Sequence, residues 1–210
     1  NEATYGALVD AAAKRGDLAS AEKWFRAAGS ASLSNVMTLS ALLNAASRRG
    51  NLTVATTWYE RMREAGLRMN SVIFTIMVQV AARTAGLSEA EGWFQKAVEA
   101  GVDLDIVIFN TLIGVAAKEG NLASAERWFH LAEGMGILPT EVTFNALINA
   151  AAVSRDLSSA EGWLLRAQES GIEPSVVTFA GVIKAAARSQ ESSRLEHWFA
   201  EAREAHVQPN

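Results

Sequence analysis

Cysteine is missing from this chain of 210 residues, and so is any long hydrophobic run. Without cysteine there can be no disulfide, no thiolate metal site and no cysteine nucleophile, which is compatible with a reducing compartment. No apolar stretch reaches the roughly 18 to 20 residues that a membrane-spanning helix needs. The chain opens with Asn1 rather than methionine and shows no targeting segment, so we interpret it as a processed chain or a fragment.

Positive charge is also scarce, because 19 basic residues face 23 acidic ones and the formal net charge is −4. Taken as a total, this charge argues against a nucleic-acid partner. Half of the residues are hydrophobic and a fifth are charged, which is typical of a globular chain rather than a disordered one.

Motifs that support catalysis are missing as well. The sequence contains no glycine-rich phosphate loop, no nucleophile elbow and no HxE…CxxC deaminase signature. His130, His197 and His206 share no helical face and have no evident acidic partner, so we predict surface or helix-end positions for them. Glu89 and Glu91 lie in an acidic segment and are predicted to be solvated. We therefore expect no enzyme activity, no cofactor and no metal site.

What the chain does have is internal repetition. Its six tryptophans recur every 34 or 35 residues, at Trp24, Trp58, Trp93, Trp128, Trp163 and Trp198. Aligned on them, the chain divides into six copies, 2–35, 36–70, 71–105, 106–140, 141–175 and 176–210. The segment VTFNALINAAA of the fifth copy corresponds to VIFNTLIGVAA in the fourth and VIFTIMVQVAA in the third. Residues 1–210 are thus predicted to form a single repeat array.

Each copy has the pattern of two helices joined by a turn. In the first helix apolar residues recur at helical spacing, as in Phe144, Leu147, Ile148, Ala151 and Ala152. Turns such as RGD and EGN supply glycine for a left-handed helix end, and the next residue is an N-cap for the second helix, at Asp17, Asn51, Asn121 and Asp156. The second helix carries the pattern AExWF, whose tryptophan we predict to pack between copies. The fold class is therefore all-α, a right-handed α-solenoid superhelix of six helix-turn-helix repeats.

A unit of 35 residues with the form VTFNALI…AA…G(N/D)L..AE..F…G(I/V)…P resembles the pentatricopeptide repeat, and the resemblance covers the whole chain. The tetratricopeptide repeat has a period of 34 but lacks the VTFN helix start. Tryptophan in the second helix departs from the usual leucine of the pentatricopeptide pattern, which bears on packing only.

The resemblance implies which residues contact a ligand. In this family, a residue in the first turn of the first helix and the last residue of the same copy together read one RNA base. The first-turn residues are Gly6, Ser40, Thr75, Asn110, Asn145 and Ala180, and the last residues are Asn35, Asn70, Asp105, Thr140, Ser175 and Asn210. For the polar first-turn residues, local backbone bonds are the alternative role.

The side chains at these positions predict a base order. Ser40 with Asn70 should favour A, and Thr75 with Asp105 should favour G because an ionised carboxylate only accepts hydrogen bonds. Asn110 with Thr140 should take a pyrimidine, and Asn145 with Ser175 resembles a pair that reads C in this family. By family analogy the RNA 5′ end lies at the N-terminus, which gives A-G-Y-C over copies two to five, where Y is C or U.

Two further sets of residues recur once per copy. An apolar residue precedes each reading position by three residues, at Met37, Val72, Val107, Val142 and Val177, and the resemblance implies that it wedges between bases, although core packing would also favour valine. A basic residue ends five of the first helices, at Lys14, Arg48, Arg83, Lys118 and Arg188, whereas Val153 stands in the fifth copy. We predict that these cations bind phosphate, and the alternative is that they stabilise helix C-termini.

The charge is unevenly distributed along each copy. The first 14 residues of the six copies together hold eight basic and four acidic residues, whereas the remainder holds eleven basic and nineteen acidic ones. The negative total therefore conceals a positive first-helix side, which the resemblance places on the concave face.

These observations favour a binder of single-stranded RNA, at about one base per repeat, that serves RNA metabolism in a mitochondrion or chloroplast by family analogy. The alternative is a structural solenoid that binds other protein subunits within a larger complex. No DNA partner and no membrane span are expected. Since the sixth copy ends at Asn210 without a capping helix, we also expect the native chain to continue or another chain to cover this end. A stable, monodisperse monomer of these 210 residues would contradict that expectation.

Overall fold

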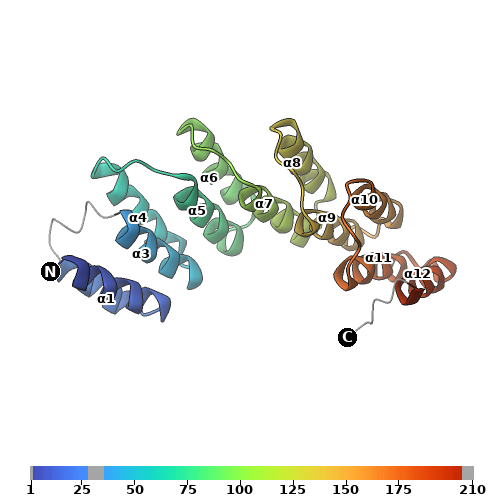
Figure 1. Ribbon diagram of the computed structural model, residues 1–210, viewed down its shortest axis with the longest axis horizontal. Helices are drawn as coiled ribbons and strands as arrows, with labels where there is room; N and C mark the ends of the chain where they lie inside the picture. The colour runs from blue at the N-terminus through green and yellow to red at the C-terminus, as the bar shows by residue number, and fades with distance from the viewer. Residues whose placement is uncertain (1, 28–35, 205–210) are drawn as a thin grey trace. The chain divides into compact units, whose positions relative to one another are not determined.

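The computed structural model describes residues 2–27 and 36–204, and all regular structure in these ranges is α-helical (Figure 1). The helices are α1 (Glu2–Lys14), α2 (Leu18–Ala27), α3 (Val36–Arg48), α4 (Leu52–Glu64), α5 (Ser71–Thr84), α6 (Leu87–Glu99), α7 (Ile106–Lys118), α8 (Leu122–Gly134), α9 (Glu141–Val153), α10 (Leu157–Glu169), α11 (Val176–Ser189) and α12 (Ser192–Glu204). Each copy contributes two of them, as its sequence predicts.

The chain forms two compact units, residues 1–108 and 109–210. In the first unit α3 packs against its own second helix, α4, and against the neighbouring first helices α1 and α5. In the second unit α9 packs in the same way against α10 and α11. First helices therefore stack on first helices, and each covers its partner, which makes the chain an all-α helical repeat solenoid. The handedness of the superhelix stays a prediction.

The second helices begin at the predicted N-caps. The side chain of Asn51 accepts a hydrogen bond from the backbone nitrogen of Val54 at 3.1 Å, and that of Asp156 accepts from Ser159 at 2.9 Å. Asp17 and Asn121 make the same bond, and hydrogen bonding by Ser20 lowers the pKa of Asp17. Each bond satisfies a backbone N–H that the helix itself leaves without a partner.

The turn before each of these caps needs a left-handed residue. Gly50 and Gly120 occupy it with φ of 63° and 70°. In the fifth and sixth copies the equivalent residues are Arg155 and Gln190, with φ of 59° and 63°. Side chains with a β-carbon are disfavoured in this region, so these two copies hold the shared turn geometry at an energetic cost.

The tryptophans lie between copies, as predicted. Trp58 and Trp93 are almost fully buried, and Trp128 and Trp163 are buried as well. The ring of Tyr59 meets that of Trp93 edge-on, with centroids 4.8 Å apart, and Phe129 meets Trp163 in the same way. The aromatic residue that follows one tryptophan therefore packs against the tryptophan of the next copy, a geometry that aromatic pairs prefer.

Small residues let the first helices approach each other closely. At Gly181 of α11, a β-carbon would lie only 2.7 Å from a methyl carbon of Ile148 on α9. A side chain at this position would therefore push the two helices apart or displace the buried isoleucine.

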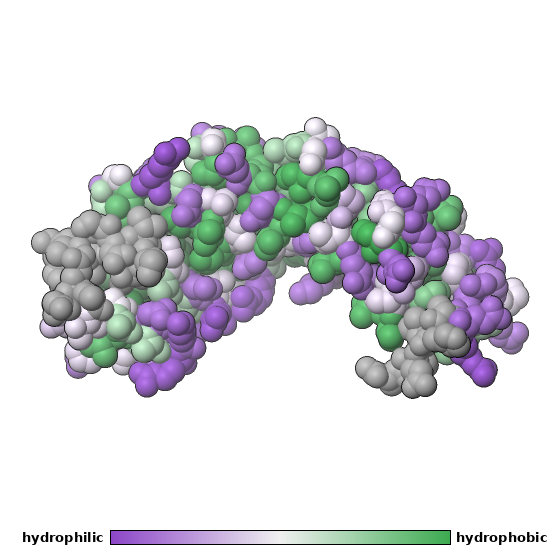
Figure 2. Space-filling model, viewed as in Figure 1, coloured by the Kyte–Doolittle hydropathy of each residue, from purple (hydrophilic) through white to green (hydrophobic). Residues whose placement is uncertain are grey.

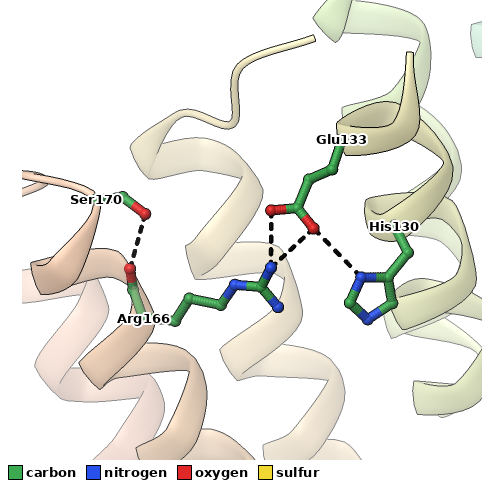
Figure 3. Close-up of polar contacts among 4 residues, drawn as sticks. All are labelled: His130, Glu133, Arg166 and Ser170. Carbon is green, nitrogen blue, oxygen red and sulfur yellow. Dashed lines mark hydrogen bonds and ion pairs between the residues drawn. The ribbon is translucent and has the colours of Figure 1, made fainter. Parts of the chain in front are cut away.

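Polar contacts also join the second helices (Figure 3). The guanidinium Nη2 of Arg166 on α10 lies 2.8 Å from each carboxylate oxygen of Glu133 on α8. Nδ1 of His130 lies 3.2 Å from the same carboxylate. The prediction that the histidines lack an acidic partner is thus wrong for His130, because Glu133 lies one helical turn further along α8. His130 is nevertheless exposed, as predicted.

Candidate nucleic-acid interface

The predicted base-reading residues of the first helices lie at corresponding places on successive helices. Ser40, Thr75, Asn110 and Asn145 are half-buried in the first turns of α3, α5, α7 and α9. Gly6 on α1 is also half-buried, and Ala180 on α11 is exposed. Of the last residues of the copies, Asn70, Asp105 and Thr140 are exposed and Ser175 is half-buried, whereas Asn35 and Asn210 lie outside the described residues.

Each described last residue has a structural role that the sequence interpretation missed. Oδ1 of Asn70 accepts from the backbone nitrogen of Ile73 at 3.1 Å, and Oδ1 of Asp105 accepts from Ile108 at 3.0 Å. These residues are therefore N-caps of the next first helix. The cap uses one oxygen only, so the amide nitrogen of Asn70 and the second oxygen of Asp105 are not engaged by the cap bond.

In the fourth copy, the two predicted reading residues are joined through a third residue. The hydroxyl of Thr143 donates to Oδ1 of Asn110 at 2.7 Å and lies 3.2 Å from the hydroxyl of Thr140. The Asn110 amide nitrogen in turn lies 3.4 Å from the Thr140 hydroxyl. Thr143 belongs to the next copy and is fully buried. The side chains of Asn110 and Thr140 are thus held together across a copy boundary.

The fifth copy repeats this arrangement. The Thr178 hydroxyl donates to Oδ1 of Asn145 at 2.8 Å and lies 3.3 Å from the hydroxyl of Ser175. The Asn145 amide nitrogen lies 3.3 Å from a carboxylate oxygen of Glu141 on the same helix. Asn145 therefore makes no cap or turn, although asparagine usually prefers such positions in helices. Its carbonyl oxygen is bound to a buried hydroxyl and its amide nitrogen lies on the exposed side.

The second and third copies differ in this respect. The hydroxyl of Thr75 donates to the backbone oxygen of Ser71, one turn back on its own helix, at 2.8 Å. In the copies that follow Ser40 and Thr75, the place of the threonine is taken by the buried, apolar Ile73 and Ile108. Sequence reasoning overlooked these residues, but a signal exists: the two asparagines are each followed 33 residues later by threonine, and the two hydroxyl residues by isoleucine.

The predicted wedge residues reach the surface. Val72, Val107, Val142 and Val177 are between 44% and 64% exposed, although they stand in helices whose other apolar residues are mostly buried. The side chain of Met37 lies outside the described residues. On the face of the molecule drawn in Figure 2, hydrophobic residues are interspersed with hydrophilic ones. Because these valines are not buried, core packing does not account for the recurrence of valine at this place, one turn before each reading residue.

The five basic residues at the ends of the first helices are exposed, and some of them contact neighbouring groups. Nη1 of Arg83 donates to the backbone oxygen of Arg48 at 3.3 Å, and Nη1 of Arg188 donates to that of Ala152 at 3.3 Å. Lys14 forms an ion pair with Asp10 at 2.8 Å. Arg83 and Arg188 therefore each stabilise the C-terminal end of the preceding first helix. Binding of phosphate by this set of residues stays a prediction.

Within residues 2–27 and 36–204, no group of three or more His, Cys, Asp or Glu side chains is placed to hold a metal ion. None of the helices in these ranges has the length and apolar character needed to cross a membrane.

Helix pairs that stack copy upon copy define a class of protein, the all-α helical repeat solenoids. The model of the pentatricopeptide repeat domain matches residues 93–153 and 164–210, and the PPR repeat model matches residues 3–27, 37–67 and 142–172. The chain therefore belongs to the pentatricopeptide repeat family. No curated protein matches the sequence.

Solved structures of this family share the fold. The pentatricopeptide repeat protein PPR10 from maize is 23% identical, with a TM-score of 0.66 over 100% of this chain and 34% of that chain. PPR10 in complex with an 18-nt psaJ RNA element is 22% identical, with a TM-score of 0.66 over 100% of this chain and 36% of that one. The PPR domain of Arabidopsis thaliana protein-only RNase P 1 in complex with tRNA is 16% identical, with a TM-score of 0.67 over 79% of this chain and 88% of that one. This chain thus spans about a third of the length of the PPR10 chains that it matches.

Proposed function

We propose that this chain binds single-stranded RNA with sequence selectivity, at about one base per repeat. The observation that carries the proposal is the recurrence, in the first turns of α5, α7 and α9, of a polar side chain together with an exposed valine, with the amides of Asn110 and Asn145 held by hydrogen bonds. A periodic polar and apolar surface fits a chain of bases, because each base has hydrogen-bonding edges and two apolar faces. PPR10 and the PPR domain of protein-only RNase P 1 are both described in complex with RNA, which supports the same class of partner here.

The groups exposed in each copy select the base. Asp105 offers a carboxylate oxygen to an imino N–H, and in combination with Thr75 this favours G. Asn110 and Asn145 offer amide N–H groups to the carbonyl oxygen of a pyrimidine, and Ser40 with Asn70 leaves room for A. The expected order is therefore A-G-Y-C from copy two to copy five, with the RNA 5′ end at the N-terminus of the protein. Gly6 and Ala180 offer no side-chain hydrogen bond, so copies one and six should discriminate little.

Lys14, Arg48, Arg83, Lys118 and Arg188 supply the attraction to phosphate that this mode of binding needs. Single-strand binders combine such a row of cations with surfaces for the bases, and their affinity falls steeply with salt. We place the activity in organellar RNA metabolism, in a mitochondrion or chloroplast, and we expect no catalysis by the repeats themselves.

A second candidate is a solenoid subunit that binds protein. The observation in its favour is that Arg83 and Arg188 donate hydrogen bonds to backbone oxygens at the end of the preceding first helix. A cation at this place therefore stabilises the fold even when no RNA is bound. Exposed Leu131 and Leu165 on the second helices also offer apolar surface to a protein partner.

Selection from a pooled library of random single-stranded RNA, at two salt concentrations, distinguishes the two candidates. The proposal expects enrichment of A-G-C-C and A-G-U-C, with affinity that decreases as salt rises. Retention of RNA without any sequence enrichment would reduce the function to non-selective binding. No retention at low salt would overturn the proposal and leave the protein-binding solenoid.

A further inference from the structure

Two buried threonines determine which atom of the asparagine amide faces outward. The Thr178 hydroxyl accepts from the backbone nitrogen of Ser175 at 3.1 Å and has a single proton, which it donates to Oδ1 of Asn145. Thr143 accepts from the backbone nitrogen of Thr140 at 2.9 Å and donates to Oδ1 of Asn110. Because an asparagine amide has one accepting end and one donating end, a bond that fixes the oxygen also fixes the nitrogen.

Both threonine hydroxyls are held in place by the start of their own helix. Each takes part in a capping box with the preceding loop residue, Thr140 or Ser175, whose backbone N–H occupies one lone pair of the hydroxyl oxygen, while the hydroxyl proton is directed to the asparagine Oδ1. Thr143 and Thr178 are 0% and 2% exposed, which excludes water as a competing partner for the hydroxyl proton.

We infer that Thr143 and Thr178 are positioning residues for base selection: each fixes the amide of the preceding copy's asparagine with its N–H groups outward, so that copies four and five select a base with a carbonyl acceptor. Pyrimidines present such an acceptor at O2, and the long asparagine side chain leaves less room for guanine, the purine whose O6 is also a carbonyl acceptor. The specificity of a copy therefore depends on a residue of the next copy. This inference rests on the proposed RNA binding and adds to it a determinant outside the two reading positions.

The test compares Thr178→Val, which removes the hydroxyl at constant shape, with Thr178→Ser, which keeps it. The probes are labelled single strands containing A-G-C-C, in which the base opposite copy four or copy five is replaced in turn by A, G or U. For Thr178→Val, discrimination between pyrimidine and purine at the copy-five base should fall by about fivefold, since one hydrogen bond is removed. Discrimination at the copy-four base should not change. Thr143→Val should reduce discrimination at the copy-four base and leave discrimination at the copy-five base unchanged.

Thr178→Ser should retain the discrimination of the unmodified protein, and circular dichroism melting checks that every variant is folded. If Thr178→Val does not fold, Thr178→Ser is compared with Thr178→Ala, because these two variants differ only in the hydroxyl group. If the unmodified protein discriminates at copy five and Thr178→Val discriminates equally well, the inference is wrong and the proposed function stands. If the unmodified protein shows no preference at any base, the proposed function fails, and the inference fails with it.

Discussion

The indole nitrogen of Trp198 donates to a carboxylate oxygen of Glu161 at 2.7 Å, although the two residues lie on the second helices of successive copies. Trp163 makes the same bond with Glu126 at 3.3 Å. In each pair the glutamate stands two residues before the tryptophan of its own copy. In copies four to six, packing of the second helices is thus accompanied by a hydrogen bond that satisfies the one polar atom of the tryptophan ring.

Trp93 is an informative exception. Its indole nitrogen is buried and has no hydrogen-bond partner among the described residues, and Thr56 stands where the other copies have glutamate. The indole nitrogen of Trp58 is likewise buried without a partner among these residues, although Glu22 stands at the corresponding place, where it pairs with Arg26 at 3.6 Å. We expect Thr56→Glu to raise the free energy of unfolding by about 1 kcal/mol, because a buried donor gains an acceptor. Urea denaturation measures the change, and Thr57→Glu on the exposed side of α4 is the control for added charge. Equal effects of the two substitutions would contradict this explanation.

Replacement of Gly181 by alanine should destabilise the protein by about 1 to 3 kcal/mol, because the new methyl group would overlap Ile148. Gly162→Ala in α10 is the matched control, since its β-carbon would meet no atom within 4 Å. That substitution should stabilise the protein by up to about 1 kcal/mol through helix propensity. Thermal denaturation of both variants gives the comparison, and a stabilised Gly181→Ala variant would show that α9 and α11 can separate without cost.

The row of cations predicts a change in salt dependence. Substitution of Arg48, Arg83, Lys118 and Arg188 by Gln should weaken binding of all single strands alike and reduce the salt slope by about 0.7 for each phosphate that is no longer neutralised. The control removes the same charge from exposed positions on second helices, with Arg26, Arg63, Arg127 and Arg203 changed to Gln. Identical salt slopes for the two quadruple variants, both folded by circular dichroism, would favour the protein-binding solenoid.

The exposed valines predict a decrease in affinity without a decrease in stability. Val142→Ser combined with Val177→Ser should reduce RNA affinity by at least about tenfold, because bases would no longer bury the exposed part of four methyl groups, and full burial of one such group is worth about 0.8 kcal/mol. The free energy of unfolding should change by less than about 0.5 kcal/mol for each substitution at these exposed sites. Leu165→Ser, at an exposed leucine of a second helix, should change neither quantity. Unaltered RNA binding by the double variant would exclude a wedge role.

The base read by copy three can be altered by design. Thr75→Asn, with Asp105 retained, should move the preference at that base from G to U. The change should be incomplete, because Ile108 stands where Thr143 and Thr178 orient the other asparagines. The double variant Thr75→Asn with Ile108→Thr should discriminate more sharply than Thr75→Asn alone. Competition binding with strands that differ at this single base measures both variants, and an unmoved preference would mean that residue 75 does not read.

The sequence predicts the fold well because its signals are local. The tryptophan period, the apolar spacing around Phe144 and the caps at Asp17, Asn51, Asn121 and Asp156 each depend on interactions within one helix or between adjacent helices, and all are confirmed. Glycine alone, however, does not identify the left-handed turn. Arg155 and Gln190 adopt the same conformation because the surrounding repeat geometry overrides their own preference.

The candidate site is less predictable because its contacts cross copy boundaries. Alignment by copy compares Thr143 with Thr178 and hides the bond between Thr143 and Asn110, which joins two different positions of successive copies. The cap formed by Asn70 is hidden for a similar reason, since the residue ends one copy and its bond lies in the next. The partner of His130 is local but equally hard to predict, because Glu133 belongs to no recurring motif.

The bond between Thr178 and Asn145 has a consequence for how such arrays can be recombined. A crossover in the loop between two copies would place the asparagine of one copy against whatever residue the incoming copy carries at the threonine position. A crossover within the first turn, between the threonine and asparagine positions, would instead transfer each asparagine together with the hydroxyl that orients it. Segments exchanged between arrays, by gene conversion or in the laboratory, should therefore preserve base selection best when their borders lie within the helices and not between the repeats.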